Sequence, residues 1–120
     1  MRAATQGTLT TPAVLRAQTE RLLQHPKARA FTENFTGQWL LLRQIDFTNS
    51  DKKLYPEHDA LLQASMVKET HLFFEELLKN DRSLLNFVHS DFAMLNGRLA
   101  AHYGIAGVRG QEFRPVKPAF

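Results

Sequence analysis

The chain has 120 residues, 43% of them apolar, no cysteine, and a formal net charge of +3. Without cysteine, this chain can form no disulfide, thiolate zinc site, cysteine nucleophile or covalent c-type haem attachment. Its basic residues form no stripe interleaved with aromatics, and no apolar run reaches eighteen residues, so we predict neither nucleic-acid binding nor a membrane span.

This length and apolar content suit one domain with its own core. Nearly all apolar residues fall into segments with helical spacing, and no segment alternates as a strand does. We therefore predict an all-α fold: a single-domain helical bundle of four to five helices that covers residues 1–120. We expect residues 1–10 and 105–120 to be irregular, the latter as a C-terminal tail.

The first predicted helix covers residues 12–24. Thr11 followed by Pro12 is typical of an N-cap with proline at the first helical position. His25-Pro26 ends this helix and begins the next, because proline disfavours helical geometry in the residue before it and is tolerated in a first turn.

The second predicted helix covers residues 26–43 and has the clearest period. One face carries five large or apolar residues spaced by three or four: Ala28, Phe31, Phe35, Trp39 and Leu42. We predict that this face is core. Gly37 in mid-helix lowers helix propensity by about 1 kcal/mol, which suggests that another backbone packs closely there.

The third and longest predicted helix runs from Pro56 to about Lys79 and is apolar on two sides. A helix of this kind is usually buried on two sides. We predict that it lies at the centre of the bundle, between the Phe31-Phe35-Trp39 face and an apolar face of the last helix.

Two shorter helical segments follow. Asp81 is a candidate cap for a turn that contains "LLNFV", and Ser90 or Asp91 for a last helix over residues 92–103. The core stripe of that helix comprises Phe92, Leu95, Leu99 and Tyr103. Gly104 with Ile105 is typical of a glycine C-cap with its apolar contact, and Phe113 is a candidate to fold back onto the bundle.

Two glutamates, Glu69 and Glu76, fall inside the apolar arc of the central helix. A buried carboxylate without donors would be costly, so we expect neighbouring side chains to hold Glu69. The candidate donors are Arg43, Asn96, Arg98 and His102. Two interpretations stay open: a structural polar cluster, or a catalytic or ligand-binding pocket formed by Glu69, Asn96, Arg98 and His102, related to polysaccharide or redox chemistry.

No motif in the sequence specifies a reaction, and whether the protein is an enzyme stays open. The histidines show no metal-ligand spacing, and we predict neither a metal nor a cofactor. We expect a scaffold or interaction module. Its remaining apolar residues would contact adjacent domains of a parent chain or a second copy: Leu40, Leu41, Val67, Phe74 and Leu78.

Three stretches carry a resemblance to a known family: "LLQHPKARAFTENFTGQWLLLRQID", "LYPEHDALLQASMVKETHLFFEELLKNDRSLLNFVHSDFAMLNGRLAAHYGI" and "GVRGQEFRPV". Over residues 7–116 the chain resembles the domain of unknown function 1592. The resemblance implies a segment of large exported multidomain proteins of planctomycetes and related bacteria, often linked to a cytochrome c-like domain. It therefore implies a periplasmic or extracellular setting, and it supplies no catalytic residues.

Overall fold

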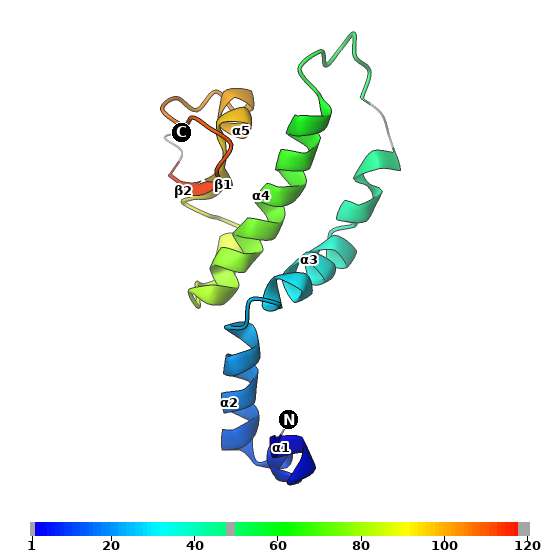
Figure 1. Cartoon of the computed structure of the whole chain (residues 1–120). Coiled ribbons are helices and arrows are strands. Elements are labelled where there is room, and N and C mark those ends of the chain that lie inside the picture. The colour runs from blue at the N-terminus through cyan, green and yellow to red at the C-terminus, as the bar shows by residue number, and fades with distance from the viewer. Residues whose placement is uncertain (1, 48–49, 118–120) are drawn as a thin grey trace. The chain divides into compact units, whose positions relative to one another are not determined.

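The computed structural model describes residues 2–47 and 50–117, which form mostly helices (Figure 1). The chain divides into two compact units, the first ending at Phe31 and the second beginning at Thr32. The helical class predicted from the sequence is confirmed in outline, but the second unit also contains a small antiparallel sheet, so the fold is not purely α-helical.

The first unit contains α1 (Arg2–Thr5), the 3-10 turn η1 (Thr8–Thr10) and α2 (Pro12–Leu23). The predicted start of α2 at Pro12 is confirmed, although the Thr11 side chain makes no capping hydrogen bond. Helical turns also occupy much of residues 1–10, which were expected to be irregular. A hydrogen-bonded elbow at residues 24–27 separates α2 from α3 (Ala28–Trp39), whose first four residues belong to this unit.

Helix α3 is shorter than the predicted 26–43. Leu41 adopts a positive φ of 54°, which ends helical geometry, and the 3-10 helix η2 (Leu42–Phe47) follows. The prediction that the Phe31-Phe35-Trp39 face is core was wrong, because these side chains are 52%, 44% and 53% exposed. The buried residues of α3 are small: Thr32, Thr36 and Gly37. Helical spacing identified the apolar face, but about half of each of these three side chains remains exposed.

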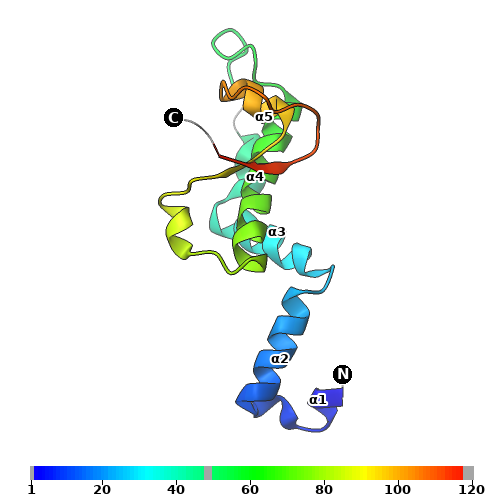
Figure 2. The same cartoon turned by 90° about the vertical axis from the view of Figure 1, so that its left-hand side faces the viewer.

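Helix α4 (Ala60–Lys79) is the longest element and begins four residues after the predicted Pro56. Its N-cap is Asp59, whose side chain accepts a hydrogen bond from the Leu62 N–H at 2.6 Å. On one side α4 packs against β1 (Ala93–Leu95) and α5 (Gly97–His102). On the other side the Phe74 ring meets Phe35 of α3 at 5.3 Å between ring centroids. The prediction of a central helix with neighbours on two sides is confirmed (Figures 1 and 2).

The predicted last helix over residues 92–103 is instead a strand followed by a short helix. Strand β1 pairs antiparallel with β2 (Arg114–Val116), with Ala93 opposite Val116 and Leu95 opposite Arg114. Asn96 is the physical reason for the break: its backbone is extended, and its side chain accepts from the Leu99 N–H, so the helix begins after it. Strand β2 lies in the tail that was expected to be irregular.

The turn after α5 follows the predicted glycine cap. Gly104 has a φ of 70°, the Ile105 N–H donates to the Ala100 carbonyl at 2.8 Å, and the Gly104 N–H donates to the Ala101 carbonyl at 3.3 Å. This pair of bonds is a Schellman motif, and Ile105 supplies its apolar contact. The motif turns the chain back toward the core.

The core of the second unit consists of two clusters. In the leucine cluster, Leu62, Leu95 and Leu99 are fully buried, and tail residues Val108, Phe113 and Val116 pack against them. The second cluster contains Leu77, Phe92 and Met94. Phe92, Leu95 and Leu99 were predicted as core and are buried, and the expected return of Phe113 is confirmed.

Candidate functional site

Glu69 lies half-buried on α4, where its carboxylate meets a residue that was predicted to belong to the apolar core. The Tyr103 hydroxyl donates to Glu69 Oε2 at 2.9 Å. Burial raises the pKa of Glu69 above its usual value, and the bond from Tyr103 offsets part of that rise. Burial, followed by the hydrogen bond to Glu69, raises the pKa of Tyr103 to about 12. The pair therefore favours a neutral tyrosine donating to the carboxylate.

Three of the four predicted donors have other hydrogen-bond partners in the structure. The Asn96 amide donates to Ser65 Oγ at 3.1 Å while its oxygen caps α5. Arg98 pairs with Asp59 at 3.2 Å and donates to the Glu57 carbonyl, and Arg43 donates to Asn34 Oδ1. His102 lies on α5, its ring 5.4 Å from that of Tyr103. Asn96, Arg98 and Tyr103 thus connect α5 and its N-cap to α4 at three different points.

The connection at the start of α4 is ionic. Arg98 Nη2 lies 3.2 Å from Asp59 Oδ2, and the same carboxyl group caps α4. The hydrogen bond from the Leu62 N–H is the largest cause of a lowered pKa of Asp59, and Arg98 lowers this pKa further. Arg98 was predicted to be a partner for Glu69, but its side chain reaches Asp59, ten residues earlier on the chain.

Glu76, the second glutamate of the apolar arc, is held by a residue that follows α4. Arg82 Nη2 lies 2.6 Å from Glu76 Oε1, and the guanidinium of Arg82 is 4.5 Å from the centroid of the Phe92 ring. The arginine therefore covers the second core cluster while it neutralises the carboxylate. The charge of Glu76 is compensated without a flanking helix.

These polar groups join α4 to its neighbours. Side chains that were candidates for one pocket use their hydrogen-bonding groups on Ser65, Asp59 and the Leu99 N–H. Within residues 2–47 and 50–117, no three His, Asp or Glu side chains are grouped so as to hold a metal ion. Over the same ranges, no helix is both long and apolar enough to cross a bilayer.

The second unit has a different surface feature, formed by α3 and the 3-10 helix η3 (Leu84–Phe87). Phe87 packs edge-on against Trp39 with ring centroids 5.4 Å apart and also meets Phe74 at 5.9 Å. The residues next to these rings in sequence include several exposed apolar ones, which we call the apolar patch together with Phe35, Trp39 and Phe87: Leu40, Leu41, Leu84, Leu85 and Val88. The patch joins residues more than forty positions apart in sequence.

Sequence reasoning did not include the η3 residues in the predicted contact surface, because "LLNFV" was interpreted only as a short helical turn. A signal was present in the sequence. Four apolar residues within five positions point in all directions from a helical turn, so one neighbouring element cannot cover them all. Ser83, and not the predicted Asp81, caps this turn by accepting from the Leu85 N–H.

Comparison with known proteins gives one match. Residues 1–105 match the family described as "Protein of unknown function (DUF1592)", PSD4. No curated protein and no solved structure matches the chain significantly.

Proposed function

Because the chain belongs to the DUF1592 family, whose function is unknown, we propose a role from its own surface: an interaction module whose apolar patch is covered by another polypeptide. The polypeptide is an adjacent domain of a parent chain or a second copy. The observation that carries this proposal is the exposure of η3, where Leu84, Leu85 and Val88 are 75%, 74% and 89% exposed next to the Trp39 and Phe87 rings.

The energetics of apolar burial favour a partner that covers the patch. Moving a leucine- or valine-sized side chain from water into an apolar contact gains roughly 1.5–3 kcal/mol, and contiguous exposed apolar patches on proteins usually mark interaction sites. The patch also includes two aromatic rings, and aromatic side chains are enriched in protein interfaces. Its supporting residues are ordered by ring contacts, because Phe74 touches both Phe35 and Phe87 from α4. The surface is therefore preorganised for a partner.

This geometry refines the surface expected from the sequence. Leu40 and Leu41 are exposed and belong to the patch. Val67, Phe74 and Leu78 are half-buried, and Phe74 contacts rings within its own unit. We propose that Phe74 supports the patch from within, so a Phe74→Asp variant would test folding more than association.

The test is a double variant, Leu85→Asp with Val88→Asp, compared with Leu54→Asp as a matched control. Leu54 is equally exposed, at 72%, but lies in the loop before α4. If a second copy covers the patch, light scattering will show a mass that rises with concentration in the wild type and the control, and a monomer in the double variant.

If an adjacent domain covers the patch, the chain alone will be monomeric. Hydrogen exchange at residues 84–88 will then slow when the flanking parts of the same gene are expressed with it, and the double variant will abolish that protection. Absence of both self-association and protection would contradict the proposal.

The biological setting stays a prediction from the family resemblance. We propose an exported multidomain protein of planctomycete type, located in the periplasm or outside the cell and linked to a cytochrome c-like domain. Reading the gene on both sides of this segment tests that setting, because a haem-attachment motif and a signal peptide would both be visible there.

The alternative, a catalytic or ligand-binding pocket formed by Glu69, Asn96, Arg98 and His102, has one supporting observation. The raised pKa of Glu69 is of the kind found at functional sites as well as in structural clusters. A thermal-shift screen with soluble polysaccharides would support this alternative if wild type responded and Glu69→Gln did not.

A further inference from the structure

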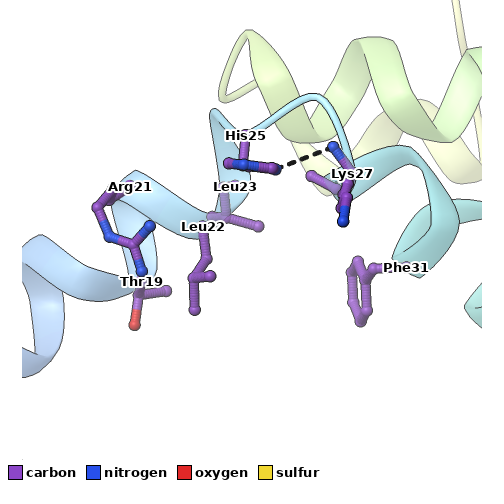
Figure 3. Close-up of a pocket in the computed structure, with 8 residues that line it drawn as sticks. Thr19, Arg21, Leu22, Leu23, His25, Lys27 and Phe31 are labelled. Carbon is purple, nitrogen blue, oxygen red and sulfur yellow. Dashed lines mark hydrogen bonds between the residues drawn. The ribbon is translucent and has the colours of Figure 1, made fainter. Parts of the chain in front are cut away.

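The elbow between α2 and α3 forms a pocket within the first unit (Figure 3). Its volume is about 530 Å³, within the ~300–1,000 Å³ typical of binding pockets. Its lining surface is mostly apolar but includes basic residues, and it comprises Thr19, Arg21, Leu22, Leu23, His25, Lys27, Ala28 and Phe31. None of these residues belongs to the apolar patch of the second unit.

The walls of this pocket are fixed by the elbow itself. The His25 N–H donates to the Leu22 carbonyl at 3.2 Å, and the Ala28 N–H donates to the His25 carbonyl at 2.8 Å. The Lys27 N–H donates to His25 Nδ1 at 3.1 Å, the bond drawn in Figure 3. Pro26 has a fixed φ and restricts the residue before it. The hydrogen bonds and the proline therefore fix the shape of the opening between α2 and the first turn of α3.

The apolar side chains of this unit are poorly covered. From residue 3 to residue 31, no residue is buried. Leu22 and Phe31 are 56% and 52% exposed, and Figure 3 shows their side chains extending from the two helices toward the same open side. A helix of twelve residues such as α2 is marginal in water unless tertiary contacts support it. Covering the pocket would supply such contacts.

The charge of this unit indicates which partner fits. Residues 1–31 contain five Lys or Arg and a single acidic residue, Glu20, which pairs with Arg16 at 2.9 Å. In the part of the chain that the structure describes, no acidic side chain pairs with Arg21 or Lys27 of the pocket lining. Two cations therefore flank an apolar opening, and carboxylates on a partner would complement them.

We propose that this pocket binds an acidic amphipathic helix of a partner polypeptide. A large apolar side chain of that helix occupies the space between Leu22 and Phe31, and its carboxylates face Arg21 and Lys27. A basic apolar surface can also attract an anionic membrane, but a concave opening suits a protruding side chain better than a flat lipid surface. The pocket thus gives the protein a second docking site, separate from the patch on η3.

The experiment measures fluorescence polarisation of a labelled synthetic helix of glutamate, alanine and leucine with one tryptophan. Two control peptides replace either every glutamate by lysine or every leucine and the tryptophan by alanine. We expect only the acidic, apolar peptide to bind the full chain. Arg21→Glu with Lys27→Glu will weaken binding roughly tenfold or more, because the variant repels the carboxylates of the peptide. A tenfold loss corresponds to ~1.4 kcal/mol of binding free energy.

Matched variants separate the pocket from general charge and folding effects. Lys52→Glu with Lys53→Glu makes the same change in net charge outside the pocket and will leave the dissociation constant unchanged, as will Leu85→Asp in the patch. Phe31→Ala will weaken binding while circular dichroism stays that of the wild type. Three results would overturn the proposal: equal binding of the acidic peptide without apolar residues, an equal effect of Lys52→Glu with Lys53→Glu, or no peptide binding. In the last case, co-sedimentation with phosphatidylserine vesicles would identify a membrane surface instead.

Discussion

The two sides of α4 show how similar apolar sequences reach different degrees of burial. On the side of β1 and α5, Leu62, Leu95 and Leu99 are fully removed from water. On the side of α3 and η3, rings contact one another, yet Phe35 and Trp39 remain 44% and 53% exposed. The first side has backbone and polar connections that hold its layers together. The second is held mainly by ring contacts, so its outer surface is available to a partner.

The largest expected difference between the two sides is in the cost of removing a side chain. Leu99→Ala leaves a cavity in a fully buried cluster and will lower the free energy of unfolding by about 2–5 kcal/mol. Phe87→Ala, at a site 39% exposed, will cost less despite the larger side chain removed. Urea denaturation of both variants checks this order, and a larger loss for Phe87→Ala would break the comparison.

Two glycines sharpen the comparison at the level of the backbone. A Cβ added to Gly97 would lie 2.9 Å from the Gly110 carbonyl oxygen, so Gly97→Ala will destabilise by about 1–3 kcal/mol. At Gly37 the nearest atoms belong to the Arg43 side chain at 3.5 Å, so the predicted close approach of another backbone was wrong. Gly37→Ala will instead be neutral or will stabilise by up to about 1 kcal/mol through helix propensity. In thermal unfolding, Gly97→Ala should lower the melting temperature, whereas Gly37→Ala should leave it unchanged or raise it.

The smallest expected effect concerns the pH dependence of the α4–α5 contact. The folded state raises the pKa of Glu69 above its ordinary 4.5, so its stabilising contribution is complete below that value and is lost as pH rises through the folded pKa. Glu69→Gln keeps an acceptor for Tyr103 and removes the buried charge. We expect a gain of less than about 1 kcal/mol at neutral pH that fades toward pH 4, measured by urea denaturation.

The exposed Glu112 gives the control for this pH test. Glu112→Gln should follow the wild type throughout. A neutral-pH loss of stability in Glu69→Gln would show that the charged hydrogen bond to Tyr103 outweighs the cost of burial. Asp59 acts in the opposite sense, because its pKa is lowered and its contribution is lost as pH falls through the folded value.

Local rules in the sequence predicted the fold where one residue decides the outcome. Pro12 begins α2, and Gly104 ends α5 with a positive φ. The spacing of Phe92, Leu95 and Leu99 identified buried residues but not their secondary structure. That spacing fits a helix, whereas Asn96 caps in the middle of it, and a three-residue strand is too short to show a period of two.

Burial and side-chain partners were harder to predict because both depend on elements distant in sequence. Trp39 shows the same helical spacing whether its side chain is buried or exposed. Its exposure depends on how much of α3 another element covers. For Glu69 the position was identified but the donor was not. Tyr103 was counted as an apolar stripe residue, although a tyrosine hydroxyl on a packed face usually needs an acceptor, and Glu69 was the nearby carboxylate.

The pairing of β1 with β2 affects where the C-terminal boundary of the folded unit should be placed. The family match covers residues 1–105, whereas Val108, Phe113 and Val116 pack against the leucine cluster and Arg114–Val116 supplies the second strand. A boundary drawn from family similarity alone would cut the sheet in half and leave three fully buried leucines open to water. The second unit thus extends past the matched residues, and its last strand lies beyond residue 105.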